Sequence, residues 1–307
     1  PTEYTARLSD GYVIVDQAER RRFIREQVTA LAKTNGGSAR LDEDLLDEVT
    51  NLVEYPTAFC GHFAEEYLAV PAEVLITSMK EHQKYFPLFS EDGQLLPMFI
   101  GVRNGADNHL DNVIKGNEKV LEARLSDAKF FFDEDQKQPL EANLTKLQGV
   151  VFQEGLGTLA DKVERLTALA PRLAEELGLG TYAASIERTA RLSKADLATQ
   201  MVYEFPELQG IMGEKYALLG GESQDIARGI AEHYKPRFSG DTLPETIEGK
   251  IVGLADKLDS LVGYFALGKI PTGSQDPFAL RRQAQGVIQV LLANHYSISL
   301  RKLINLA

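Results

Sequence analysis

The sequence predicts a mainly helical protein in which an α+β module is followed by an all-α domain. Two patterns support this division. In the first half, the apolar runs Tyr85–Phe89 and Leu95–Val102 flank Glu91-Asp92-Gly93, which is typical of a β-hairpin. From about Gly149 onward, apolar residues recur at helical spacing and no strand alternation is present. We therefore expect the boundary between Pro139 and Gly149.

A short strand and two helices are expected before Pro56. Tyr12–Val15 reads as the strand. Asp16, followed by Glu19 as in a capping box, begins the first helix, and Gly36-Gly37 ends it. The second helix has apolar residues on one face until Pro56 stops it. These apolar residues are Leu45, Leu46, Val49, Leu52 and Val53.

Two further helices belong to the first module. Pro71 suits the start of a helix that continues through Val74, Leu75 and Met79. After the hairpin, a longer helical pattern runs from about Asp111 to Phe132. The first module is therefore expected to mix helices with a small antiparallel sheet.

The second half reads as a succession of helices separated by glycine and proline. Gly178 and Gly180 follow the first of these helices, and Pro206 ends the second. Pro277 suits the first position of the last helix, with Ser274 or Asp276 as its cap. The expected helical segments are Leu156–Leu177, Ala184–Tyr203, Ile226–Tyr234, Ile247–Leu267 and Phe278–Asn294.

The composition is that of a globular protein with an acidic surface. The 45 acidic residues outnumber the 33 basic ones, which gives a net charge of −12. Such a surface repels polyphosphate and argues against nonspecific nucleic-acid binding by the whole molecule. The single cysteine, Cys60, excludes a disulfide framework and fits a reducing cytosol, so we expect a cytoplasmic location.

The ends of the sequence and its apolar runs give three further expectations. No apolar run approaches the length of a membrane span, so no membrane partner is expected. No secretory signal opens the sequence. Because the first residue is Pro1, we expect the chain to be part of a longer protein.

The segment Pro271–Arg282 is unusual in so acidic a chain. Its turn residues lead into a helix that presents Arg281 and Arg282 within its first two turns. Backbone donors and two guanidinium groups would then converge on one small volume, which suits phosphate. Between Lys269 and Lys302 the net charge is +4, because five basic residues face one acidic residue. This favours a specific contact with an anion, although a solvated helix face would give the same pattern.

Motifs for nucleotide chemistry are missing from the sequence. There is no Gly-Lys-Ser/Thr phosphate loop, and no glycine-rich dinucleotide fingerprint follows a strand. There is also no cysteine pair for zinc and no Gly-x-Ser-x-Gly elbow. We therefore expect no cofactor in this chain, and any ATP chemistry of the parent protein is expected elsewhere.

Three polar positions in the helical half are spaced like the metal ligands of the HD phosphohydrolase superfamily. The chain resembles that pattern at Asp196, His233 and Asp256. Imidazole and carboxylate together hold a metal ion and lower the pKa of bound water. However, Ala195 stands where the His of the His-Asp pair belongs, and the first helix offers no His near Asp161. The resemblance therefore implies a degenerate site without metal, whose helices remain as a scaffold.

A second basic cluster lies just before the hairpin. Lys80, His82 and Lys84 border the aromatic pair Tyr85-Phe86. Basic groups next to aromatic rings can hold an RNA backbone and stack an unpaired base. The alternative is that the two rings belong to the core and that His82 forms a structural hydrogen bond.

Several motifs occur in an order that is specific to one family. Together they closely resemble the β subunit of the bacterial heterotetrameric glycyl-tRNA synthetase, over nearly the whole chain. The motifs are Met79-Lys-x-x-Gln-Lys-Tyr-Phe-Pro87, Gly116-Asn-Glu118, Arg124-Leu-x-Asp-Ala128, Gly155-Leu-Gly-Thr-Leu159, Glu204–Gly213, Tyr234-x-Pro-Arg-Phe238, Ala255-Asp-Lys-Leu-Asp259 and the segment Pro271–Arg282.

The resemblance implies a division of labour in an α2β2 enzyme. The α subunit would hold the class II catalytic site, which uses ATP and Mg, while the β subunit would bind tRNA. It also implies a central fragment of the β subunit with three parts. Residues 1–148 would form an editing-domain-like α/β module, and residues 149–270 a degenerate HD-like helical domain. Residues 271–307 would be a basic helical segment leading to an anticodon-binding region that lies outside this sequence.

We therefore expect an accessory module that positions tRNA(Gly) for the α subunit and has no catalytic residue of its own. One alternative is a metal-dependent HD-type phosphohydrolase. Another is a purely structural module that docks subunits through the helix Ile247–Leu267. The expected phosphate contacts are Arg281, Arg282, Lys257 and Lys194, with Lys80, His82 and Lys84 as a second patch.

Overall fold

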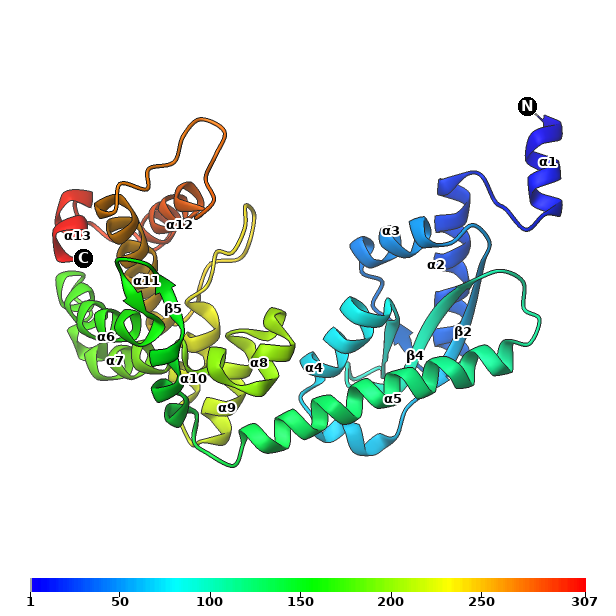
Figure 1. Cartoon of the computed structure of the whole chain (residues 1–307), viewed down its shortest axis with the longest axis horizontal. Coiled ribbons are helices and arrows are strands. Elements are labelled where there is room, and N and C mark those ends of the chain that lie inside the picture. The colour runs from blue at the N-terminus through cyan, green and yellow to red at the C-terminus, as the bar shows by residue number, and fades with distance from the viewer. Residues whose placement is uncertain (1) are drawn as a thin grey trace. The chain divides into compact units, whose positions relative to one another are not determined.

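The computed structural model describes residues 2–307, and the chain forms two compact units that divide between Phe132 and Asp133 (Figure 1). The boundary expected near Gly149 lies later along the chain. The difference arises because the 3₁₀ segment η3 (Leu140–Gly149) packs within the second unit, with Leu140 and Leu147 buried. The chain has the mainly helical α+β architecture that the sequence predicted.

The first unit is built on a four-stranded antiparallel sheet with the order β1-β3-β4-β2. Helix α2 packs on this sheet, and its Ile24 and Val28 share a core with Phe86 and Ile100. The strands are β1 (Ser38–Ala39), β2 (Pro56–His62), β3 (Phe86–Phe89) and β4 (Leu95–Asn104). The helices are α1 (Thr2–Asp10), α2 (Gln17–Thr34), α3 (Glu43–Leu52), η1 (Glu65–Ala69), α4 (Ala72–Thr77), the π-helical turn η2 (Ser78–His82) and α5 (Leu110–Asp135).

Most of the expected elements of the first unit are present. The hairpin is formed by β3 and β4, and the long helix is α5. Asp16 caps α2, because its carboxylate accepts the backbone N–H groups of Ala18 and Glu19 at 2.8 and 3.4 Å. The helix expected from Pro71 to Met79 ends its α-helical part at Thr77 and continues as the π-helical turn η2.

The strand expected at Tyr12–Val15 is wrong. This stretch is a loop between α1 and α2, and α1 itself was not expected from the pattern. Tyr12 has a φ of +59°, a left-handed conformation that a strand cannot contain. Ile14 donates its N–H to the carbonyl of Glu54, but no ladder of strand hydrogen bonds follows.

The second unit is a helical assembly around α11. Helix α11 contacts α6, α7, α10 and α12, and buried residues cover most of its circumference. A helix that is apolar on nearly all sides is typical of a buried position. The helices are α6 (Leu159–Glu176), η4 (Gly180–Tyr182), α7 (Ala183–Leu192), η5 (Ala195–Ala198), α8 (Gln200–Glu204), η6 (Pro206–Leu208), α9 (Ile211–Leu219), α10 (Gln224–Glu232), α11 (Ile247–Ala266), α12 (Leu280–Ala293) and α13 (Leu300–Leu306).

Three expectations for the second unit need correction. The unit is not entirely α, because β5 (Val151–Gln153) and β6 (Gly157–Thr158) form a small hairpin. The helix expected over Ala184–Tyr203 is broken into α7, η5 and α8, since Ser193, Lys194 and Asp196 are all buried there and Thr199 begins a new helix. Finally, α12 begins at Leu280 rather than at Pro277.

Among residues 2–307, no helix combines the length and the apolar character that crossing a bilayer requires.

Candidate functional site

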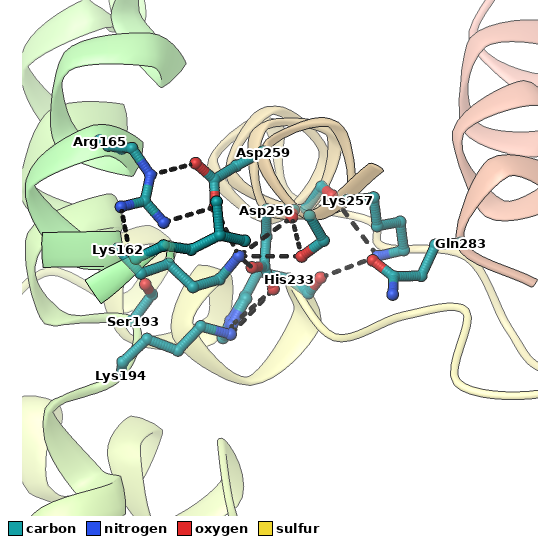
Figure 2. Close-up of polar contacts among 12 residues, drawn as sticks. Lys162, Arg165, Ser193, Lys194, His233, Asp256, Lys257, Asp259 and Gln283 are labelled. Carbon is teal, nitrogen blue, oxygen red and sulfur yellow. Dashed lines mark hydrogen bonds and ion pairs between the residues drawn. The ribbon is translucent and has the colours of Figure 1, made fainter. Parts of the chain in front are cut away.

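The helical unit contains a buried cluster of charged side chains around Lys194, at the break between α7 and α8. The ammonium nitrogen of Lys194 lies 2.7 Å from Nε2 of His233 and 2.8 Å from Oδ2 of Asp256 (Figure 2). It also lies 4.1 Å from the ring centroid of Tyr234. His233 follows the last residue of α10, and Asp256 belongs to α11. A lysine thus lies between an imidazole and a carboxylate that would otherwise be free to share a metal ion.

The hydrogen bonds of His233 define its tautomer. Its Nδ1 lies 2.6 Å from the carbonyl oxygen of Ile230, which can only accept, so Nδ1 carries the proton. Nε2 then accepts from Lys194. Burial, together with the positive charge of Lys194, holds the pKa of His233 well below its usual range. His233 is therefore neutral, and its only ring acceptor is already used.

Lysine 162 and Asp259 extend the cluster toward α6. Nζ of Lys162 lies 2.8 Å from Oδ1 of Asp256 and 2.9 Å from Oδ2 of Asp259. It also donates to the hydroxyl of Ser260 at 2.9 Å. Arg165 completes the arrangement by a two-point contact with Asp259 at 2.5 and 3.2 Å (Figure 2). Asp256 therefore bridges two ammonium groups, and its carboxylate is fully engaged.

The ionisation of the cluster follows from these contacts. Burial favours the neutral acid at Asp256, but Lys162 and Lys194 outweigh burial and hold its pKa well below the usual range. Burial also lowers the pKa of Lys194, although Asp256 opposes the shift. At Lys162, burial is outweighed by the two aspartates, so its pKa is raised. The buried ammonium groups of the cluster are thus neutralised by the buried carboxylates that they contact.

Asp196, the third position of the HD-like pattern, has a different task. Its Oδ2 accepts the backbone N–H groups of Gly210 and Gly213 at 2.5 and 3.2 Å, at the start of α9. The close approach requires glycine at 213, where an added Cβ would lie 2.6 Å from Ile230. Burial raises the pKa of Asp196 to about 6, although these hydrogen bonds oppose the shift. Asp196 therefore fixes the backbone and does not join His233 and Asp256.

Metal-ligating groups do not gather in the part of the chain that the structure describes. Within residues 2–307, no three His, Cys, Asp or Glu side chains are placed to hold a metal ion together. Ala195 is buried and its side chain has no ligating atom. Asp161 forms a capping box with Thr158 at the start of α6, where its carboxylate accepts the backbone N–H of Thr158 at 2.7 Å. The residues present therefore do not fit the metal that the HD-like pattern would use.

A cavity of about 470 Å³ opens beside the cluster. Its wall has one carboxylate, that of Asp256, and aromatic rings of Phe152, Tyr234 and Phe278. Nζ of Lys162 and Lys194 lie over two of these rings, those of Phe152 and Tyr234. The basic residues of the wall are Lys162, Lys194, Arg237, Lys257 and Arg282. Lys162 and Lys194 are compensated by Asp256 and Asp259, so the excess positive charge of the wall comes from Arg237, Lys257 and Arg282.

Lys257 is a buried wall residue and not a surface contact. Its Nζ donates to the carbonyl oxygens of His233 and Lys235 at 3.1 and 2.9 Å. Burial lowers its pKa to about 8, although Asp256 opposes the shift. Lys194 is likewise buried. Neither ammonium group is on the open surface, so the expectation that both reach a tRNA backbone finds no support in their position.

Arg281 and Arg282 are exposed on the first turn of α12, as the turn chemistry indicated. The carboxylate of Asp276 accepts the N–H groups of Leu280 and Arg281 at 2.8 and 2.9 Å and so caps the helix. Arg281 reaches back to the carbonyl of Thr272, whereas Arg282 lines the cavity. Arg282 also lines an adjoining cavity of about 510 Å³, to which Arg281 contributes. Two exposed guanidinium groups thus border one hollow surface.

The two lysines of the basic cluster of the first unit form ion pairs with acidic residues of α3 and its N-cap. Lys80 forms an ion pair with Asp42, and Lys84 lies 2.9 Å from Glu48. Tyr85 stacks on Phe99 with ring centroids 4.4 Å apart, and Phe86 is fully buried. The aromatic pair therefore belongs to the core, which was the alternative reading. His82 is half-buried on the π-helical turn, and a role of these residues in RNA binding remains a prediction.

Four charged residues of the cavity and the cluster were missed from the sequence: Lys162, Arg165, Arg237 and Asp259. A signal was present for Lys162, because it shares a helix face with Leu166 and Leu169, which are four and seven residues later. Asp259 similarly follows Val252 and Ala255 on the buried face of α11. A charge on an apolar stripe is an indication of a buried ion pair.

The comparisons with known proteins support the family that the sequence motifs indicated. The family model described as "Glycyl-tRNA synthetase beta subunit" matches residues 1–307. The chain belongs to this family. It is 54% identical over 308 residues to the glycine–tRNA ligase beta subunit of Desulforamulus reducens, covering 100% of this chain and 44% of that protein. It is 51% identical over 305 residues to the beta subunit of Bacillus subtilis strain 168, covering 99% and 45%.

The match confirms the resemblance that the sequence motifs indicated. The chain spans less than half the length of these curated relatives. Their name places them in an aminoacyl-tRNA synthetase with more than one kind of subunit. In this chain, the buried cluster around Lys194 and the cavity beside it contain no group of metal ligands among residues 2–307.

Proposed function

We propose that this chain is a tRNA-binding part of a glycine–tRNA ligase beta subunit in the cytoplasm. Its role is to position tRNA(Gly) for aminoacylation, which the α subunit of an α2β2 enzyme catalyses with ATP and Mg. Membership of the family supports the ligase, and the exposed Arg281 and Arg282 beside a positive cavity support the contact with tRNA. This second observation carries the proposal, because it is a local basic surface on a chain of net charge −12.

A role in positioning tRNA, without catalysis, is consistent with the charged cluster of the helical unit. Its buried cations and carboxylates compensate one another, and His233 is neutral with both ring nitrogens engaged. No side chain of the cluster is therefore free to act as nucleophile or base on a bound substrate. Holding one end of a tRNA near a distant active site accelerates aminoacylation by orientation alone.

The test is the double variant Arg281→Ala/Arg282→Ala in the assembled enzyme. Each lost phosphate contact reduces counterion release, so tRNA binding weakens at low salt. The slope of log K against log salt is expected to fall by about 2, without a change in preference among tRNA sequences. Filter binding or fluorescence titration of tRNA(Gly) between low and physiological salt measures both quantities.

Arg301→Ala is the matched control, because Arg301 is exposed on α13 and lines neither cavity. It should leave the salt slope unchanged, and glycine activation should be normal in all variants. Wild-type tRNA affinity and salt dependence in the double variant would refute the assignment of these two arginines.

The two alternative functions receive less support. A metal-dependent phosphohydrolase needs ligands, but Lys194 lies between His233 and Asp256, and Asp196 is bound to backbone N–H groups. A docking surface on α11 needs exposed apolar residues, but Ile251, Leu254 and Leu258 are buried in the core of the unit. Phe265, near the end of α11, is half-exposed and is too small a surface for a stable interface.

A further inference from the structure

The cavity beside the buried cluster has the charge of an anion-binding site. Five basic side chains line it, against the single carboxylate of Asp256. That carboxylate is already paired with Lys162 and Lys194, at 2.8 Å from each. Lys257 is satisfied by backbone carbonyls, which add no net negative charge. An anion that enters the cavity is therefore attracted by the remaining positive charge in a partly desolvated place.

Two guanidinium groups are placed to make the direct contacts. Arg282 of α12 and Arg237 of the loop after α10 both line the cavity, and both side chains are exposed. Arg237 uses one nitrogen for the carbonyl of Gln209, at 3.2 Å, and keeps further donors. A planar guanidinium fork matches the oxygen atoms of a phosphate group.

The size and the walls of the cavity indicate more than a bare phosphate ion. A volume of about 470 Å³ lies in the range of pockets that hold small organic molecules. The apolar part of the wall includes the rings of Phe152, Tyr234 and Phe278 beside aliphatic side chains. Lys162 and Lys194 lie over two of these rings, so the wall offers a planar base apolar contact next to cations.

We propose that this cavity binds a phosphorylated nucleotide, with the phosphate on Arg282 and Arg237 and the base against the aromatic wall. The nucleotide is either free or the last residue of an RNA strand. The site binds and does not hydrolyse, because the neutral His233 and the paired Asp256 leave no group to activate water. The free-nucleotide form is independent of tRNA binding, whereas the RNA-end form rests on the proposed function.

The experiment is calorimetric titration of the 307-residue chain at low salt with four probes. These are AMP, adenosine, inorganic phosphate and a three-nucleotide RNA that ends in adenosine. AMP is expected to bind at least about tenfold more tightly than either adenosine or phosphate, since each lacks one half of the contacts. Arg282→Ala should weaken AMP binding by about tenfold to a hundredfold, and Arg282→Lys should restore part of the loss.

Arg301→Ala, on exposed α13 outside the cavity, should bind AMP like the unaltered chain. Unchanged melting temperatures would show that the variants fold. Three results would each overturn the proposal. Neither AMP nor the RNA binds, phosphate binds as tightly as AMP, or the Arg282→Ala variant binds AMP as tightly as the unaltered chain.

Two comparisons separate the sources of the ligand and separate this proposal from tRNA positioning. If the RNA binds more tightly than AMP, the site takes an RNA end; otherwise it takes a free nucleotide. If AMP binds but the double variant Arg281→Ala/Arg282→Ala keeps full tRNA affinity, the proposed function fails while the nucleotide site stands.

Discussion

The side chain of Lys194 provides the cation at the centre of a buried site that has no group of metal ligands among residues 2–307. Its ammonium group satisfies His233 and Asp256 at 2.7 and 2.8 Å, and both partners are thereby withdrawn from catalysis. A metal ion would also activate water, which an ammonium group does not do. The ammonium groups of Lys194 and Lys162 therefore supply the positive charge around Asp256 and occupy both of its carboxylate oxygens.

At the same scale, Lys257 predicts a pH dependence of stability. In the folded chain, burial lowers the pKa of Lys257 to about 8, from an ordinary value of 10.5. Between these two values the unfolded chain holds a proton that the folded chain lacks, so the free energy of unfolding rises with pH. Below about pH 8 both states are protonated, and the cost of the buried charge is fully present.

Lys257→Met should remove this rise, because methionine has a similar length and no titrating group. Urea denaturation of both proteins at several pH values between 7.5 and 10 measures the difference. Surface lysines and tyrosines titrate equally in both proteins and cancel in the comparison. If the free energy of unfolding depends on pH identically in the variant, burial does not lower the pKa of Lys257.

At the scale of elements, the short helix α8 depends on a residue from the end of α5. The carboxylate of Asp135 accepts the N–H groups of Gln200 and Met201, both at 2.9 Å, and the hydroxyl of Tyr216 at 3.0 Å. Three donors from two helices thus meet on one side chain. Their hydrogen bonds connect the start of the second unit with the segment that follows Lys194.

Asp135→Asn should destabilise the second unit by about 1–3 kcal/mol, since an amide presents one acceptor oxygen where the carboxylate has two. The measurement is urea denaturation of the chain. Asp127→Asn, at an exposed position of the same helix, is the matched control and should change the free energy of unfolding by less than about 0.5 kcal/mol. Equal stability of Asp135→Asn and the unaltered chain would contradict the account of this connection.

The elements that could be predicted are those with a strong local signal. The hairpin between β3 and β4, the cap of α2 at Asp16 and the long helices α5 and α11 all follow from turn residues and apolar spacing. The loop at Tyr12 could not be predicted, because its left-handed conformation depends on contacts beyond its own sequence.

The break between α7 and α8 lacked a local signal of comparable strength. It arises because Lys194 and Asp196 satisfy partners far along the chain, His233 and Gly210 among them. For the site, the sequence spacing grouped Asp196, His233 and Asp256, but in the structure Lys194 joins the last two and Asp196 does not. Lys194 and Lys257 were expected as phosphate contacts, and the structure buries both because their partners lie near the end of α10 and on α11.

At the scale of the whole molecule, charge is distributed very unevenly. The chain has a net charge of −12, yet the wall of the cavity beside α12 has five basic side chains and one carboxylate. In the first unit, Lys80 and Lys84 are instead paired with acidic residues of α3. A polyanion is therefore expected to meet the second unit at α12 and to be repelled by most of the remaining surface.

The most direct test of this account is a crosslinking map of tRNA(Gly) on the assembled enzyme, with photoreactive groups on the RNA and peptide identification by mass spectrometry. We predict crosslinks at the beginning of α12, around Arg281 and Arg282, and in the adjoining cavity wall at Arg237. Crosslinks that lie entirely outside residues 1–307 would contradict the account and leave this chain a scaffold.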